Sequence, residues 1–316
     1  RRHRRMNASL SLPARAKLNL VLRIVGRRAD GYHLLETLFH TLALHDDLTV
    51  ALAPEGISLD VRAADPALAV PNGPDNLVVR ALRAFADDVG HRGGFRAELH
   101  KRIPHGGGLG GGSSDAAAAL RLANALLGSP RDEVALARLA VRLGADVPFF
   151  LRGGSQWGRG IGDELTPVEQ PHRWFVLIVP PFGCPTVDVY KSHAAHWKQD
   201  SLAATVPRIT VPDTGDPAVR NAFHNDLESA AERVRPELAE LRRRVVELGC
   251  RTVRMTGSGS TLFVAGDDES SARASAAALQ PLCTQRVRLL VTCSAPPGVD
   301  VPHPPDRPGG KGAWSR

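Results

Sequence analysis

The chain has 316 residues, of which 43% are hydrophobic and 23% are charged, an ordinary composition for a globular protein with room for two modest domains. No apolar run approaches the roughly 18 residues that a membrane span needs. The basic N-terminus is not followed by the apolar core of a secretory signal, because Arg15 and Lys17 interrupt it. Composition therefore excludes a membrane-spanning protein, and we expect no membrane partner and a cytoplasmic location.

The formal net charge of +7 lies mainly at the two ends of the chain. Residues 1–5 contribute +4 and residues 295–316 contribute +1, which leaves +2 for the body. The body lacks the Lys/Arg stripe and aromatic platform that nucleic-acid binding uses, so we expect no nucleic-acid partner. The four cysteines are widely spaced without a C-x-x-C pair, which favours neither a zinc site nor disulfides.

The first predicted strand covers residues 15–25, where apolar and polar residues alternate with a period of two. Lys17 and Asn19 fall on the polar face, which for this pair alone is most simply a solvated face. A D-G turn leads to a second strand at 32–44. Tyr32 and His33 follow that turn, and residue chemistry assigns them no role. An amphipathic helix is predicted at 76–86.

Six glycines surround Leu109 between a predicted strand at 95–103 and a predicted helix at 113–127. Such a run is costly to order, so something must approach its backbone closely. With Ser113 as N-cap, the loop would present free N–H groups at a helix N-terminus, which is an anion site. A phosphate group is the natural occupant.

Two well-known phosphate motifs fit this loop poorly. Gly106, Gly108 and Gly111 satisfy G-x-G-x-x-G, but no acidic residue follows a second strand, because residues 131–143 are predicted to be helical. The Walker pattern fails because no G-K-[ST] closes the loop. A flexible linker is the simpler alternative, and the flanking strand and capped helix argue against it.

The next helix is predicted to begin with Ser129 as N-cap, with Asp132 completing a capping box, and to end at Gly144. Asp146 follows, and the proline at 148 biases Val147 toward an extended conformation. Such an aspartate most often serves a turn. If it faces the glycine loop, it becomes a candidate general base or metal ligand.

Two prolines within residues 166–172 mark a domain boundary, so we expect domains at 7–165 and 166–294 and a disordered tail at 295–316. The second domain is predicted to be a split βαβ sandwich. Its expected elements are strands at 174–179, 252–255, 262–264 and 287–293 and helices at 187–197, 225–248 and 269–279. Residues 200–216 are predicted to be mobile, and the turn at 257–259 is either a hairpin tip or a second loop near the phosphate site.

Three motifs in order resemble those of the GHMP family of small-molecule kinases: A-x-K-L-N-L, P-x-G-G-G-L-G-G-G-S-S and M-T-G-S-G-S. Longer runs, among them G-R-R-A-D-G-Y-H-L-L-E-T and L-G-A-D-V-P-F-F, resemble the branch of this family that acts on a cytidine diphosphate substrate. The similarity covers about residues 14–294. It implies a two-domain α+β fold, with an N-terminal ribosomal-protein-like α/β domain that binds ATP and a C-terminal ferredoxin-like α+β domain.

The resemblance implies ATP-dependent transfer of the γ-phosphoryl group to the 2-hydroxyl of a cytidine-diphosphate methylerythritol, in the non-mevalonate route to isoprenoid precursors. Asp146 matches the base that accepts the hydroxyl proton, and Lys17 matches the cation that holds Asp146 and the hydroxyl. Mg²⁺ is expected to accompany ATP, held chiefly by phosphate oxygens and water, with Ser113 or Ser114 as candidate ligands.

The resemblance also assigns binding residues by position. Near the nucleotide base it places Asn76, Leu77 and Lys101. Around the ATP phosphates it places Pro104, His105, Gly106, Gly107, Gly108, Leu109, Gly110, Gly111, Gly112, Ser113 and Ser114. Tyr32 and His33 match positions that recognise cytosine, Tyr190 replaces a stacking Phe, and Asn19 and Thr186 lie where the substrate is held. His105 departs from the family, which has a hydrophobic residue there.

Two alternative functions stay open from the sequence. The first is another kinase of this superfamily, acting on homoserine, mevalonate or a sugar, against which the D-G-Y-H motif and Tyr190 argue. The second is a basic RNA-binding protein, since the N-terminal half of the superfamily resembles a ribosomal-protein fold; Lys17, Asp146 and the intact glycine loop argue against it. The sequence does not determine the oligomeric state, and a monomer or weak homodimer is expected.

Overall fold

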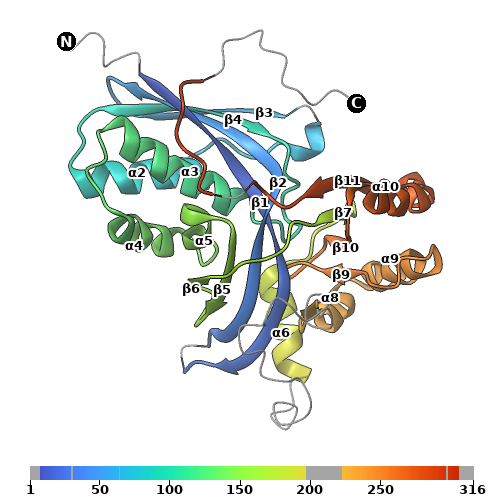
Figure 1. Ribbon diagram of the computed structural model, residues 1–316. Coiled ribbons are helices and arrows are strands. Elements are labelled where there is room, and N and C mark those ends of the chain that lie inside the picture. The colour runs from blue at the N-terminus through green and yellow to red at the C-terminus, as the bar shows by residue number, and fades with distance from the viewer. Residues whose placement is uncertain (1–7, 30, 64, 197–222, 297, 306–316) are drawn as a thin grey trace.

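The computed structural model describes residues 8–29, 31–63, 65–196, 223–296 and 298–305. Figure 1 shows two lobes, with the long strands β1 (Ser9–Arg27) and β2 (His33–Ala53) running from one into the other. The two strands pair antiparallel over almost their whole length. Leu12 of β1 belongs to the core of the first lobe, whereas Leu22 and Ile24 belong to the core of the second.

Seven strands of the described chain form the first sheet. The order is β3-β4-β2-β1-β8, with β5 paired to β2 and β6 paired to β5. Only the β3–β4 and β1–β8 pairs are parallel. The further members are β3 (Ile57–Ala63), β4 (Gly94–Lys101), β5 (Ser155–Arg159), β6 (Glu164–Pro167) and β8 (His224–Asn225). Of these, β3, β5, β6 and β8 were not predicted from the sequence, and Asn225 of β8 was expected to begin a helix.

Helices of the first lobe pack against this sheet (Figure 1). They are α2 (Leu77–Val89), α3 (Gly111–Leu126), α4 (Glu133–Leu143) and α5 (Val147–Arg152), preceded by the 3₁₀ turn Pro66–Leu68. Four alanines of α3 are fully buried: Ala116, Ala117, Ala119 and Ala123. Their small side chains let the helix that follows the glycine loop lie close to the sheet.

The second lobe is a four-stranded antiparallel sheet in the order β11-β7-β10-β9. Its strands are β7 (Trp174–Val179), β9 (Arg254–Met255), β10 (Leu262–Gly266) and β11 (Arg288–Cys293). Its helices are α6 (Thr186–His196), α8 (Glu228–Val234), α9 (Pro236–Glu247) and α10 (Glu269–Ala278), followed by the 3₁₀ helix Gln280–Gln285. This order of elements confirms the predicted split βαβ organisation.

One predicted helix of the second lobe is two helices. The expected helix at 225–248 is interrupted at Arg235, which is extended (φ −135°, ψ 87°) because Pro236 follows it. The proline then occupies the start of α9, where its missing N–H costs nothing. None of the described helices is long and apolar enough to cross a membrane.

Three predicted helix boundaries in the first lobe are wrong. Gly110, not Ser113, is the N-cap of α3, in a left-handed conformation without a side-chain cap. Asp132, not Ser129, caps α4 by accepting a hydrogen bond from the N–H of Ala135, because Ser129 has a φ of 59° that an extended N-cap does not allow. Val147 is helical rather than extended, since the proline after it lies in the first turn of α5.

The predicted solvated face of the first strand is also wrong. Lys17 and Asn19 are each 3% exposed, and Leu18 between them is buried as well. Both faces of β1 are covered because the second lobe and the glycine loop lie against the face that the alternation assigned to water. The domain limits at 165 and 166 stay a prediction, and β6 runs across that point.

The expectation of disorder from residue 295 onward is wrong for the described part of that segment. Ser11 and His303 exchange two main-chain hydrogen bonds, and Arg15 binds the carboxylate of Asp300. These contacts with the first lobe explain why residues 298–305 are ordered although their Pro- and Gly-rich composition predicts disorder. Residues 306–316, and the segment 200–216 that was predicted to be mobile, lie outside the described residues.

His40 predicts how the fold responds to acid. Its ring is buried on β2, with Nδ1 and Nε2 each 2.8 Å from a hydroxyl, those of Ser155 and Ser294. Burial first, and then the nearby charges of Arg173 and His172, lower the pKa of His40 to about 4. The neutral ring therefore contributes stability that is complete above the ordinary pKa of about 6.5 and is lost as the pH falls toward 4.

We expect His40→Gln to remove this component of the acid response. The wild type should lose about 3 kcal/mol more of its unfolding free energy between pH 6.5 and 4 than the variant does. Urea unfolding at a series of pH values measures the difference. His100→Gln, which changes an exposed histidine of β4, is the matched control and should follow the wild-type profile. Parallel curves for wild type and His40→Gln would contradict the assignment.

Candidate active site

The structure brings Lys17 of β1 and Asp146 at the start of α5 together. The Lys17 Nζ lies 3.4 Å from Oδ2 of Asp146. The lysine side chain is 3% exposed and the aspartate side chain is 36% exposed, so the ammonium is enclosed while the carboxylate faces outward. A carboxylate at a helix N-terminus is also stabilised by the helix dipole. The pair therefore presents an accessible base backed by a fixed cation.

A chain of hydrogen bonds orients that cation. Lys17 Nζ donates to Oδ1 of Asn19 at 2.5 Å, and the Asn19 amide donates to Oγ1 of Thr37 at 2.8 Å. The Thr37 hydroxyl in turn donates to the carbonyl of Val21 at 2.7 Å. Sequence reasoning did not find Thr37, which lies on β2 and shows no local signal. The fixed network leaves the ammonium little rotational freedom.

The glycine loop joins β4 to α3 beside this pair. The Lys17 N–H donates to the carbonyl of Leu109 at 3.0 Å, so the strand with the lysine is bonded directly to the loop. Because Gly110 caps α3 without a side chain, the first N–H groups of the helix have no side-chain acceptor. Such N–H groups and the helix dipole together favour an anion.

Several loop glycines are required by close packing. A Cβ on Gly108 would lie 2.3 Å from the carbonyl oxygen of Thr256, and one on Gly110 would lie 2.7 Å from the Phe150 ring. Both glycines also have a positive φ, of 80° and 74°. Gly257, in the T-G-S-G-S turn between β9 and β10, would meet Gly108 in the same way. The turn at 257–259 is therefore packed against the glycine loop and is not a free hairpin tip.

Side chains of the second lobe hold that turn in place. Asn225 donates from Nδ2 to the carbonyls of Met255 and Gly257, both at 2.8 Å. The Thr256 hydroxyl accepts from the N–H of Asn19 at 3.0 Å. Thr186, a predicted substrate residue, is exposed at the start of α6 with its hydroxyl 2.9 Å from that of Ser258. Asn225 is a further residue of the site that sequence reasoning did not single out.

Of the residues predicted near the nucleotide base, Asn76 and Leu77 lie at the start of α2. Asn76 caps this helix by accepting from the N–H of Val78 at 2.8 Å, and its amide donates to the carbonyl of Pro71. Leu77 would be 3.5 Å from a Cβ on Gly112, which places it against the first turn of α3. The Asn76 side chain thus already has two partners.

Lys101, the third of these residues, lies in a buried triad of charges. Its Nζ is 2.5 Å from Asp46 and 2.9 Å from Asp115, and all three side chains are buried. Asp46 also accepts from the N–H groups of Arg102 and Ile103, at 2.5 and 2.9 Å. The triad therefore fixes the junction between β4 and the loop, and only the main chain of Lys101 is left for a ligand.

The electrostatics of the triad favour a charged lysine and a neutral acid. Burial lowers the pKa of Lys101, but the two carboxylates outweigh it and the net direction is upward. Burial, and then the charge of Asp46, raise the pKa of Asp115 to about 8 against the opposing effect of Lys101. Neither Asp46 nor Asp115 was identified as a site residue from the sequence, since their role depends on a contact across three elements.

The three residues predicted to recognise cytosine lie at the turn between β1 and β2 (Tyr32 and His33) and on α6 (Tyr190). The His33 ring centroid is 5.1 Å from that of Tyr190, and Tyr32 is 62% exposed beside it in the chain. Burial, the charge of His193 and the charge of Arg27 lower the pKa of His33. Burial, and then the charge of Asp146, raise the pKa of Tyr190, which places this ring within the field of the catalytic candidate.

Comparison with known protein families agrees with this geometry. Residues 76–154 match the GHMP kinase N-terminal domain and residues 208–282 match the GHMP kinase C-terminal domain. The 4-diphosphocytidyl-2-C-methyl-D-erythritol kinase of Marinobacter nauticus is 40% identical over 85% of this chain and 89% of its own length. That of Moorella thermoacetica is 40% identical over 86% of this chain and 95% of its own length.

Solved structures point to the same family. A crystal structure of 4-(cytidine 5'-diphospho)-2C-methyl-D-erythritol kinase covers 90% of this chain and all of its own, with 36% identity and a TM-score of 0.72. Homoserine kinase from Cytophaga hutchinsonii has the same TM-score but 18% identity, and so shares the fold alone. The described fold, the paired motifs and these relatives together show that the chain belongs to the 4-diphosphocytidyl-2-C-methyl-D-erythritol kinase family, within the GHMP kinases.

Proposed function

We propose that the protein transfers the γ-phosphoryl group of ATP to the 2-hydroxyl of 4-diphosphocytidyl-2-C-methyl-D-erythritol. The observation that carries the proposal is the position of the Lys17–Asp146 pair, between the glycine loop and the aromatic residues of α6 and the β1–β2 turn. In the reaction the bond between the γ-phosphorus and the bridging oxygen of ATP breaks. A new bond forms to the substrate hydroxyl oxygen, and ADP leaves.

The glycine loop binds the triphosphate in this proposal. Pro104 to Ser114 surround the phosphates, and the uncapped N–H groups of α3 meet their negative charge. Asn76, Leu77 and the main chain of Lys101 lie near the nucleotide base, because α2 and β4 border the same loop. His105 is exposed, which suits a position that covers the phosphates from the solvent side. These contacts position the donor group rather than change it covalently.

Asp146 accepts the proton of the 2-hydroxyl, and Lys17 holds both groups. The aspartate is accessible, whereas the lysine is enclosed and oriented by Asn19 and Thr37. General-base catalysis by such a side chain contributes about 10²- to 10⁴-fold. The lysine ammonium also neutralises charge as the oxygen attacks, so the pair combines orientation with proton transfer.

The cytidine end of the substrate binds at Tyr190, His33 and Tyr32. The exposed ring of Tyr32 and the ring of Tyr190 suit stacking on the cytosine, since aromatic side chains commonly stack on nucleobases in proteins. His33 is held neutral and so can both donate and accept a hydrogen bond. Asn19 and Thr186 lie between this end and the glycine loop, where the middle of the substrate would pass.

The donor set fits Mg²⁺ only as an ion carried by ATP. Within the ranges that the structure describes, no group of three or more His, Cys, Asp or Glu side chains could hold a metal. The hydroxyls of Ser113 and Ser114, in the first turn of α3, would complete a coordination shell made chiefly of phosphate oxygens and water. When bound, the ion supplies positive charge to the phosphoryl oxygens.

The Asp146→Ala variant tests the catalytic role. We expect kcat to fall by about 10²- to 10⁴-fold while the Kd for ATP changes less than about threefold, because the carboxylate acts on the acceptor hydroxyl. A coupled assay for ADP release gives kcat, and calorimetry gives the Kd. The exposed Asp87→Ala of α2 is the control. Equal losses of turnover and ATP affinity would contradict the assignment.

Two glycine variants test the phosphate loop. Gly106 and Gly108 both have a positive φ, but a Cβ on Gly106 meets no described atom within 4 Å, whereas one on Gly108 meets the Thr256 carbonyl. Strain of φ alone costs about 1–2 kcal/mol in both variants. We therefore expect Gly108→Ala to weaken ATP binding by more than about tenfold and Gly106→Ala to weaken it less. Similar Kd values by calorimetry would count against the packing of the two loops.

Tyr190 tests the choice of substrate. We expect Tyr190→Ala to raise the KM for the cytidine substrate by about 5- to 100-fold through loss of stacking, with the KM for ATP unchanged, and Tyr190→Phe to behave as wild type. Val187→Ala, an exposed change on the same helix, is the control. Phosphorylation of homoserine, mevalonate or a sugar at the rate of the cytidine substrate would contradict the proposed function.

A further inference from the structure

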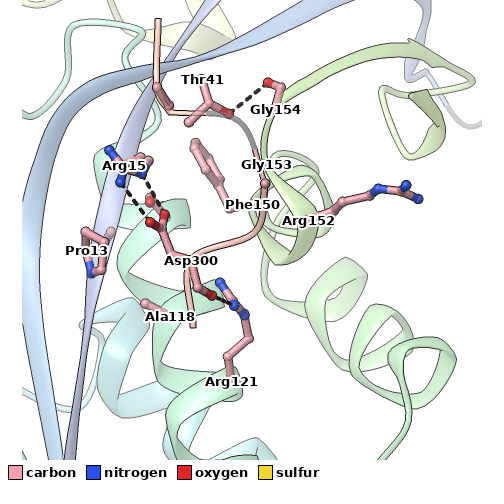
Figure 2. Close-up of a pocket in the computed structure, with 14 residues that line it drawn as sticks. Pro13, Arg15, Thr41, Ala118, Arg121, Phe150, Arg152, Gly153, Gly154 and Asp300 are labelled. Carbon is pink, nitrogen blue, oxygen red and sulfur yellow. Dashed lines mark hydrogen bonds and ion pairs between the residues drawn. The ribbon is translucent and has the colours of Figure 1, made fainter. Parts of the chain in front are cut away.

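The last described segment of the chain returns to the first lobe. The Ala295 N–H donates to the Thr41 carbonyl at 2.9 Å, and His303 pairs with Ser11 through main-chain bonds of 2.7 and 3.2 Å. We call residues 298–305 the C-terminal strap. Figure 2 shows it crossing a pocket beside β1, α3 and the end of α5. Lys17 and Asp146 do not line this pocket, whereas Ser114 at the start of α3 does, so the strap lies beside the reaction site and does not form part of it.

Asp300 is the polar centre of the strap. Its carboxylate accepts two hydrogen bonds from Arg15, from Nε at 2.6 Å and from Nη2 at 2.7 Å. Its main-chain carbonyl accepts from Nη2 of Arg121. The Arg15 and Asp300 side chains are 15% and 28% exposed, so the pair is largely shielded from solvent. A two-bond contact between ions in such a place is strong and fixes geometry.

The two arginines belong to the two elements that make the phosphate end of the site. Arg15 lies two residues before Lys17, and the β1–β2 register shifts between them. Such a bulge redirects the side chains that follow it. Arg121 lies on α3, the helix that begins at the glycine loop, on the same face as Ser114 and Ala118, which also line the pocket. Asp300 therefore joins the strand of the lysine to the helix of the loop.

We infer that Asp300 is a positioning residue for phosphoryl transfer, an inference that rests on the proposed function. Asp300 holds the bulge before Lys17 at a fixed distance from α3. It thereby preserves the hydrogen bond from the Lys17 N–H to the Leu109 carbonyl and the orientation of the Lys17 side chain toward Asp146. His33 pairs with Arg27 at the far end of β1 and Tyr190 lies on α6, whereas the strap pairs with Ser11 near the start of β1. The loss of Asp300 should thus affect ATP and turnover and spare the cytidine end.

The Asp300→Asn variant of the full chain tests the inference, because it keeps the main-chain contact to Arg121 and removes the ionic one to Arg15. We expect the KM for ATP and its Kd by calorimetry to rise about three- to tenfold, and kcat to fall by a similar factor, since small displacements of positioned groups have effects of this order. The KM for the cytidine substrate should change less than about twofold. Asp300→Glu, which restores the charge, should recover part of the loss.

A double-variant cycle and a truncation complete the design. Arg15→Gln should reproduce the effect of Asp300→Asn, and the combined variant should be no worse than either. Removing residues 306–316 leaves the strap intact and should leave both KM values unchanged. Three results would each overturn the inference. Asp300→Asn could lower thermal stability while kcat and ATP affinity stay at wild-type values, or it could change both KM values equally. The losses of activity in Asp300→Asn and Arg15→Gln could also add up in the combined variant. Failure of the wild type to phosphorylate the cytidine substrate would instead overturn the proposed function, while ATP calorimetry still reports on Asp300.

Discussion

The site depends on main-chain contacts among three segments that are far apart in the sequence. The N–H of Lys17 bonds to the glycine loop at Leu109, and the N–H of Thr261 bonds to the same loop at Gly107. Because peptide groups make these contacts, the backbones approach more closely than side chains would allow. The run of glycines thus has a second explanation besides access for a ligand: the first lobe needs them to receive the turn of the second.

Much of the local structure follows from the sequence, because strands such as β7 and helices such as α10 carry their own periodicity and caps. The placement of Asp146 directly after a helix is also local, whereas its contact with Lys17, the residue bonded to the glycine loop, joins distant segments. What failed were features set by distant neighbours. Lys17 and Asn19 looked solvated because the segments that cover them are distant in the chain, among them Thr256, which is 237 residues from Asn19. Helix α3 begins at a left-handed Gly110 in place of its predicted serine cap.

Two buried lysines near the glycine loop, Lys17 and Lys101, have different roles because their surroundings differ. Lys101 binds two enclosed aspartates, of which Asp115 is the neutral acid, so both of its partners lie inside the protein and the lysine serves the loop junction. Lys17 has one carboxylate, which is open to solvent, and one amide. A buried charge needs partners wherever it lies. Only at Lys17 is one of these partners, the Asp146 carboxylate, exposed enough to contact a ligand as well. The sequence shows both residues simply as lysines in strands.

The continuous β1–β2 ladder limits how the enzyme can move. Its paired strands extend through both cores, and the pairing continues on both sides of the register shifts at Arg15/Lys17 and Asn19/Val21. Rotation of one lobe against the other would require the paired strands to bend or several of their hydrogen bonds to break at once. Kinases that close their domains around a ligand instead rotate about hinges of a few loop residues. The distance between the glycine loop, which is bonded to Lys17 of β1, and the aromatic residues at the β1–β2 turn is therefore set when the chain folds.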